Sequence, residues 1–164
     1  MSFVISPAMR ARFDKEVAKY QAEQKVSAVM ACLAIVQHEK GHVSPEAEAA
    51  VGVYLGMPAI AVHEVTTFYN MYNQQPVGKY KLNVCTNLPC ALRSGDAALE
   101  HLCHKLGVEP YGTTADGTFT VQPSECLGAC ADAPVMLVND RQMLSFMNNA
   151  RLDELVETLK AAKD

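Results

Sequence analysis

Four of the six cysteines in this 164-residue chain form two short pairs, Cys85-x4-Cys90 and Cys126-x3-Cys130. A β-prone segment precedes each pair, Lys79–Val84 for the first and Thr118–Val121 for the second. If these strands lie side by side, joined by a right-handed crossover helix, both cysteine loops emerge at the same carboxyl edge of the sheet. The four thiolates would then meet around one small inorganic centre.

Three kinds of site compete for these cysteines. Four cysteine thiolates are the usual ligands of an iron–sulfur cluster. A structural zinc site can also use four cysteines, but zinc ribbons favour a C-x2-C spacing that neither pair has. A dithiol redox enzyme normally carries C-x-x-C, which is also absent. The spacing favours iron–sulfur and leaves zinc open.

The residues around the cysteines suit an anionic centre. The helix expected after Cys90, and the turn at Leu127-Gly128-Ala129, would point free backbone N–H groups at the site. Gly128 allows the backbone to turn closely around a ligand. The bond before Pro134 can be cis, although only about 5–6% of X–Pro bonds are.

The remaining pattern predicts an α+β chain with a helical first half. A capping Ser44 before Pro45 begins one helix, while Gly41 and Gly56 mark helix ends. Turn residues cluster at Gln74–Gly78, and a β-α-β-β-β-α order with a small mixed sheet follows, including a tight hairpin turn at Asn139-Asp140. We therefore expect two domains, residues 1–75 and 76–164.

Composition excludes several functions. The formal net charge is −4, and the basic residues are scattered, so nucleic acid is not the expected partner. No apolar run approaches the ~20 residues of a membrane-spanning helix, and the first residues do not read as a secretory signal. No Gly-x-Gly-x-x-Gly or Gly-x4-Gly-Lys motif indicates a nucleotide site. A cytoplasmic chain without direct membrane insertion is expected.

The stretch from Gly41 to Asn139 resembles the NuoE family, the small [2Fe–2S] subunits of bacterial NADH:quinone oxidoreductase, known as complex I. The most specific match is Glu125-Cys126-Leu127-Gly128-Ala129-Cys130 together with the upstream Cys85-x4-Cys90. Weaker matches are Leu55-Gly56-Met57-Pro58, Thr67-Phe68-Tyr69, Pro76–Tyr80, Thr113-Thr114 with Asp116-Gly117, and Ala133-Pro134. The chain departs from the family pattern in lacking an aromatic within Val29–His38 and in carrying Asn148-Asn149 at the last helix.

The resemblance implies an N-terminal helical bundle followed by a thioredoxin-like ferredoxin domain. It implies one [2Fe–2S] cluster on Cys85, Cys90, Cys126 and Cys130. It also implies a flavoprotein partner that holds FMN, binds NADH and exchanges electrons with the cluster, alongside further complex I subunits. The chain would then sit peripherally at the inner membrane through the assembled complex. Related subunits in NAD-linked hydrogenases and formate dehydrogenases are the alternative hosts.

Other chemistry-bearing residues have simpler interpretations. Cys103 shares a helical stripe with Leu99 and Leu106, and Cys32 shares one with Ile35, so both are predicted to be core residues. His101 and His104 are expected at or near the surface rather than on a metal. The aromatic run from Phe68 to Tyr72 is interpreted as inter-domain core, with a docking surface for the flavoprotein as the alternative.

Overall fold

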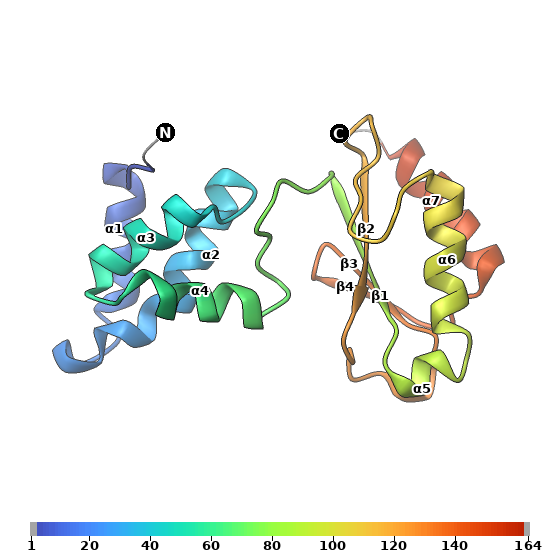
Figure 1. Ribbon diagram of the computed structural model, residues 1–164, viewed down its shortest axis with the longest axis horizontal. Helices are drawn as coiled ribbons and strands as arrows, with labels where there is room; N and C mark the ends of the chain where they lie inside the picture. The colour runs from blue at the N-terminus through green and yellow to red at the C-terminus, as the bar shows by residue number, and fades with distance from the viewer. Residues whose placement is uncertain (1–2, 163–164) are drawn as a thin grey trace. The chain divides into compact units, whose positions relative to one another are not determined.

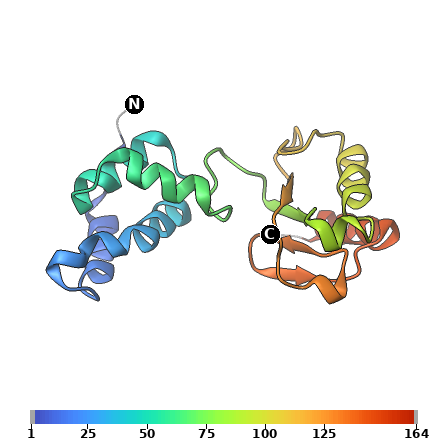
Figure 2. The same ribbon diagram turned by 60° about the horizontal axis from the view of Figure 1, so that its bottom comes forward.

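The computed structural model describes residues 3–162, which divide into two compact units at the Pro76–Val77 bond. We call them the helical unit and the sheet unit and describe each by itself (Figures 1 and 2). The division falls within the turn-rich stretch Gln74–Gly78. Within residues 3–162 no helix is long and apolar enough to cross a membrane.

The helical unit follows the capping signals in the sequence. Ser6 and Ser44 each accept a backbone N–H with the side-chain oxygen, and a proline occupies the first position of both helices that follow. Gly41 and Gly56 end their helices in the left-handed conformation, as predicted. The elements are α1 (Pro7–Val17), the 3-10 helix η1 (Ala22–Ala28), α2 (Val29–Lys40), α3 (Pro45–Leu55) and α4 (Ala59–Phe68).

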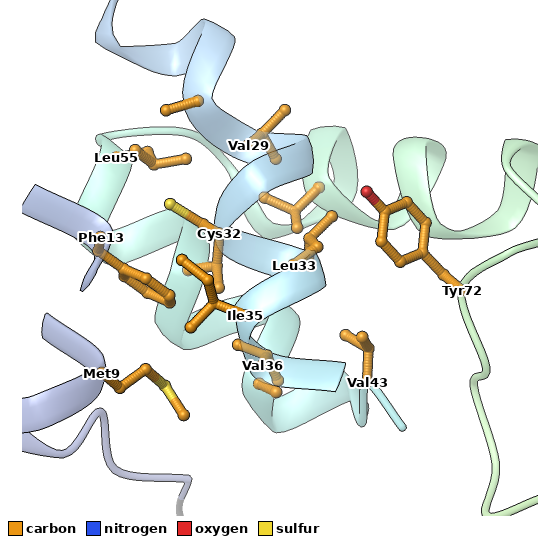
Figure 3. Close-up of a cluster of buried hydrophobic side chains, with 14 residues drawn as sticks. Met9, Phe13, Val29, Cys32, Leu33, Ile35, Val36, Val43, Leu55 and Tyr72 are labelled. Atoms are coloured by element: carbon orange, nitrogen blue, oxygen red, sulfur yellow. The ribbon is translucent and has the colours of Figure 1, made fainter. Parts of the chain in front are cut away.

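The helices of this unit enclose one apolar core (Figure 3). Cys32 is fully buried on α2, which confirms the prediction of a core cysteine. Burial raises the Cys32 thiol pKa to about 12. Tyr72 is buried beside the same core, where its hydroxyl donates to the Met30 carbonyl at 2.9 Å. The other large buried side chains include Met9, Phe13, Leu33, Val36, Val43, Val51 and Leu55.

The sheet unit has the predicted β-α-β-β-β-α order, and its sheet is mixed. β1 pairs in parallel with β2 and antiparallel with β3, giving the strand order β2-β1-β3-β4. Both long helices, α6 and α7, lie on one side of the sheet (Figure 1). The elements are β1 (Tyr80–Cys85), α5 (Leu88–Ala91), α6 (Gly95–Leu106), β2 (Phe119–Ser124), the 3-10 helix η2 (Cys130–Asp132), β3 (Met136–Val138), β4 (Gln142–Leu144) and α7 (Asn149–Ala161).

A second apolar core lies between the sheet and its two helices. Leu82 of β1, Leu102 of α6 and Leu152 of α7 are all fully buried in it. Cys103 belongs to the same cluster, as predicted. This core holds β1 and β2 firmly in place, so the loops leaving their carboxyl ends start from a rigid base.

Two turns in this unit bear on the sequence expectations. Asn139 and Asp140 both adopt positive φ between β3 and β4, which is the conformation of the predicted tight hairpin turn. The Ala133–Pro134 bond is cis, the less frequent of the two isomers that the sequence left open. An X–Pro pair carries no local signal for the minority isomer, so the sequence pattern could not indicate it.

Candidate metal centre

The four paired cysteines come together at one edge of the sheet unit. Cys85 ends β1 and lies in register with Ser124, the last residue of the parallel strand β2. Cys90 lies in α5, directly after β1, while Cys126 and Cys130 follow β2. Figures 1 and 2 show α5 beside the segment after β2 at the same end of the unit. The parallel pairing of the two strands therefore gives the convergence that the sequence predicted.

Within this edge the thiols form two close pairs. The Sγ atoms of Cys126 and Cys130 are 3.6 Å apart. The side chain of Cys85 lies close enough to Cys90 to act to raise the pKa of its thiol. A tetrahedral metal with metal–sulfur bonds of ~2.3 Å holds two sulfurs ~3.8 Å apart, so the first distance suits two thiolates on one iron. Two such pairs are the donor set that a two-iron cluster needs, and the residues present fit that group.

The pKa values of two of the four thiols, Cys90 and Cys130, are raised. For Cys90 burial is the largest cause, and the neighbouring Cys85 adds to it. For Cys130 the hydrogen bond with Cys126 is the largest cause, followed by burial. Both shifts mean that the surroundings disfavour the thiolate form of these side chains. A cationic iron centre offsets that effect, because its ligands bind as thiolates.

One backbone N–H already points at a cysteine sulfur. A hydrogen bond from the Val135 N–H acts to lower the pKa of Cys90, against the larger effect of burial. Val135 leads into β3, which is antiparallel to β1, and its carbonyl accepts the Cys85 N–H at 3.1 Å. Val135 therefore contacts both members of the buried pair, a role that the sequence pattern did not indicate.

The helix expected after Cys90 is present as α6, and a short additional helix, α5, precedes it. Cys90 lies inside the short helix α5, and the long helix α6 begins only at Gly95. A Cβ on Gly95 would lie 2.7 Å from the Cys85 carbonyl oxygen and 2.9 Å from the Cys90 carbonyl carbon. Glycine thus lets the start of α6 approach the backbone of both buried cysteines. The Ser94-Gly95 dipeptide is a turn signal that could have marked this second helix start.

Hydrogen bonds brace the cysteine loop on two flanks. On one flank Asn87 Nδ2 donates to Glu125 Oε2 at 3.0 Å, which ties the start of α5 to the residue before Cys126. On the other flank Ser145 Oγ donates to Asp132 Oδ2 at 3.0 Å. Arg151 Nη1 in turn donates to the Ser145 carbonyl at 2.9 Å. The exposed pair is therefore held by its neighbours although it lies in a loop.

The remaining candidate residues have contacts of their own. His101 Nε2 is 2.8 Å from Asp153 Oδ1 on α7, and His104 is exposed. Phe68 and Tyr69 stack edge to face and are exposed, whereas Tyr72 belongs to the helical core. Across residues 3–162 no three His, Cys, Asp or Glu side chains are grouped as ligands of a single metal ion.

Comparison with known proteins shows the family to which the chain belongs. The family model of the thioredoxin-like [2Fe–2S] ferredoxins matches residues 13–160, nearly the whole chain. The fold and the paired cysteines are those of this class of electron carrier, and the cofactor is one [2Fe–2S] cluster. Family membership thereby decides between iron–sulfur and zinc, which the cysteine spacing had left open.

The curated relatives narrow the class further. The E 2 subunit of NADH-quinone oxidoreductase from Rhizobium meliloti is 39% identical over 155 residues, covering 94% of this chain and 90% of its own length. NADH-quinone oxidoreductase subunit 2 of Thermus thermophilus is 38% identical over 150 residues, covering 92% of this chain and 83% of its own. The chain belongs to the NuoE family, as its cysteine motifs indicated.

A solved structure shares the fold as well. The crystal structure of an NAD⁺-reducing [NiFe]-hydrogenase in the H2-reduced state matches with a TM-score of 0.68 and 23% identity. The match covers 84% of this chain and 23% of the hydrogenase chain. At this identity the likeness concerns the fold alone.

Proposed function

We propose that Cys85, Cys90, Cys126 and Cys130 hold the [2Fe–2S] cluster, with one pair of thiolates on each iron. The chain then serves as an electron-transfer subunit of an NADH-quinone oxidoreductase, exchanging electrons with the FMN of a partner flavoprotein. The observation that carries the proposal is the convergence of two thiol pairs at the carboxyl ends of two adjacent parallel strands.

The residues of this chain have distinct tasks in that role. When bound, the cluster supplies one-electron redox chemistry, which cysteine thiolates alone do not. Cys85 and Cys90 are almost fully buried, so their half of the site is shielded from water. The Val135 N–H donates to the Cys90 sulfur, and such donors stabilise the negative charge that the site carries. Cys126 and Cys130 are exposed and give an electron a short route to the surface.

The oxidation of NADH is assigned to a partner. The sequence carries no nucleotide-binding glycine motif, so FMN and NADH are expected on a separate flavoprotein subunit. The names of the curated relatives support membership of a multi-subunit NADH-quinone oxidoreductase. We place the chain on the cytoplasmic side, peripheral to the inner membrane, attached through the other subunits of that complex.

NADH-quinone oxidoreductase is the preferred host among the candidates. Relatives with that name are 38–39% identical over nearly the whole chain. The likeness to the NAD⁺-reducing hydrogenase, at 23% identity, concerns the fold alone and does not favour that alternative host.

The test is the composition and spectrum of the chain purified without oxygen. We expect about two irons and two acid-labile sulfides per chain, with a rhombic EPR signal appearing after dithionite reduction. The same signal should appear when NADH is added together with the flavoprotein subunit. Zinc without sulfide would overturn the cluster assignment. A normal cluster that dithionite reduces but NADH and the flavoprotein do not would overturn the partner alone.

A further inference from the structure

The face of the sheet opposite α6 and α7 carries a row of buried polar side chains. Side chains alternate along a strand, so Lys81, Asn83 and Cys85 share one face of β1 while Leu82 and Val84 share the other. Leu82 and Val84 pack in the core with the two helices. Lys81 and Asn83 are each 2% exposed, and Cys85 is 1% exposed. The row therefore leads along β1 from a buried ammonium group to the first cysteine of the site.

Asp140 fixes the orientation of the Asn83 amide. Asn83 Nδ2 donates to Asp140 Oδ1 at 2.6 Å, and Lys81 Nζ lies 2.6 Å from Asp140 Oδ2. An ionised carboxylate only accepts hydrogen bonds, so the amide nitrogen must face it and the amide oxygen cannot. Asp140 follows β3, which runs antiparallel to β1, with Val138 opposite Leu82. Asp140 thus lies at the Lys81 end of β1, and Asn83 Oδ1 points away from that end.

Asn83 Oδ1 is a buried acceptor without a donor. Within residues 3–162 it is the buried side-chain atom that lacks a hydrogen-bond partner. Buried polar side-chain atoms are nearly always paired with protein or ordered water, so this oxygen requires a donor from elsewhere. The Lys81 ammonium on the same carboxylate disfavours a cation, and an acceptor oxygen repels an anion. A small neutral donor remains, and water is the one that buried polar sites hold.

We propose that Asn83 Oδ1 binds one buried water molecule, which donates its second hydrogen to the sulfur of Cys85. The inference rests on the proposed function, because it takes Cys85 as a cluster ligand. Cys85 is the next side chain on the same face, and at ~3.3 Å per residue the two side chains start about 7 Å apart. A water that makes hydrogen bonds of about 2.8 Å to each of two acceptors spans roughly 5 Å, which suits that spacing.

The water supplies the buried pair with its second donor. The Val135 N–H already serves the Cys90 sulfur, and the water serves Cys85, so each thiolate of the pair accepts one hydrogen bond. Reduction makes the cluster more negative by one charge, and donors to its ligand sulfurs stabilise the reduced form and raise the potential. Asn83 is thus a positioning residue, because it acts on the cluster only through the water that it holds.

Two substitutions at Asn83 separate the acceptor oxygen from the contact with Asp140. Leucine resembles asparagine in shape but has no polar atom, so Asn83→Leu removes both. Asn83→Ser also removes the amide that donates to Asp140, but its hydroxyl accepts a hydrogen bond and its small size leaves room for the water.

Gln122 supplies a matched control. It lies opposite Asn83 in register on the parallel strand β2 and carries the same amide group. Gln122→Leu removes that amide and leaves the Asn83 acceptor in place.

The experiment compares the full-length holo chain with N83L, N83S and Q122L. Each protein is exchanged into D2O, reduced with dithionite and examined by deuterium ENDOR, which detects exchangeable deuterons close to the cluster. An EPR-monitored titration gives the midpoint potential, and a crystal structure of each protein locates the water.

We expect the parent, N83S and Q122L to share one deuteron coupling that N83L lacks. In N83L the equilibrium constant for reduction should fall at least about threefold, because the reduced cluster loses a hydrogen bond. Iron and sulfide content should equal that of the parent in all three variants. If N83L does not assemble a full cluster, Asn83→Val takes its place, since valine also lacks an acceptor and suits a strand.

The outcomes separate the two proposals. An N83L protein with the parent's deuteron coupling and potential overturns the water site. N83S behaving as N83L also overturns it, because the lost contact with Asp140 would then explain both, and so does loss of the coupling in Q122L. A parent chain with zinc and no sulfide overturns the proposed function. The crystal structure then decides the water site alone, and absence of density within hydrogen-bonding distance of Asn83 Oδ1 and Cys85 Sγ overturns it.

Discussion

The two cysteine pairs differ in how the fold holds them. Cys85 and Cys90 lie within a strand and a helix and are each 1% exposed, with Gly95 and Val135 pressed against them. Cys126 and Cys130 lie after β2, are exposed, and are held mainly by side-chain bridges on either flank. The buried pair is thus part of the core of the sheet unit, whereas the exposed pair is attached to it by a loop.

This difference suggests a division of labour within one site. Residues built into a packed interior tolerate little change, because surrounding atoms cannot move away. A solvent-exposed loop can adjust, and water can solvate a substituted side chain. Substitutions at the buried pair should therefore lower both the stability of the fold and the cluster content. Substitutions at the exposed pair should lower the cluster content with little effect on the stability of the fold.

The largest effect is expected for Gly95→Ala. The new methyl group would overlap the backbone of Cys85 and Cys90, at 2.7 Å and 2.9 Å, and backbone atoms cannot rotate away as a side chain can. We expect the free energy of unfolding of the sheet unit to fall by about 3 kcal/mol, as for an overpacked core. Urea unfolding followed by circular dichroism measures it.

Gly107→Ala is the matched control at the other end of the same helix. Gly107 has positive φ, but a Cβ there meets nothing within 4 Å. Alanine should cost only about 1 kcal/mol, from backbone strain alone. Equal losses in the two variants would mean that the contact with the buried cysteines is not what constrains Gly95.

The next largest difference is expected between Cys90→Ser and Cys130→Ser, which change one cysteine of each pair. A serine oxygen can replace a thiolate as a ligand only if its charge is stabilised, and water is available at Cys130 but not at Cys90. We expect about tenfold less cluster in C90S and about twofold less in C130S. A tenfold loss corresponds to only ~1.4 kcal/mol of cluster-binding free energy. Iron and sulfide content per chain measures both. Equal retention would contradict the comparison.

A smaller effect is expected at the glycine of the exposed loop. Gly128 has a φ of 81°, and a Cβ there would enter open space. Gly128→Ala should therefore cost only about 1 kcal/mol, from the left-handed backbone. Its expected signature is faster loss of the cluster to a chelator at an almost unchanged urea midpoint. Gly128→Asn should recover part of the difference, and failure to do so would show that the backbone angle is not the cause.

Much of this arrangement could be predicted from local sequence signals. The cysteine pairs followed β-prone segments, and parallel strands bring such loops to one edge. Gly41, Gly56 and the Asn139-Asp140 turn were predicted because their conformations depend on the residues themselves. These features need no knowledge of what packs against them.

The difference between the pairs could not be predicted in the same way. Both pairs read alike in sequence, as cysteines beside glycine or proline. Cys90 is buried because α5 folds back beneath the start of α6, and Gly95 permits that approach only through a contact with residues five and ten positions earlier. The N–H of Val135 reaches Cys90 across 45 positions of sequence. Such contacts exist only once the tertiary fold is formed.

The smallest effect is expected for a residue outside both cysteine pairs. It tests whether cluster content depends only on the surroundings of the cysteines. Asp116 occupies the turn before β2, where the Thr114 hydroxyl and the Thr118 N–H donate to its carboxylate. These hydrogen bonds lower the Asp116 pKa to about 2. An unfolded aspartate has a pKa of about 3.9, so the stabilisation is fully present above that pH and is lost as the pH falls towards 2.

Asp116→Asn should therefore lower the urea midpoint slightly and by a constant amount from pH 7 down to about pH 4. Below that, the difference from the parent should shrink as the parent's carboxylate becomes protonated. Because the side chain is exposed and solvent screens its charge, the effect should remain the smallest of the series. Iron and sulfide content at pH 7 should equal that of the parent. A loss of cluster in this variant would mean that the cysteine edge responds to changes at the far end of β2, and that neither pair is governed by its own surroundings.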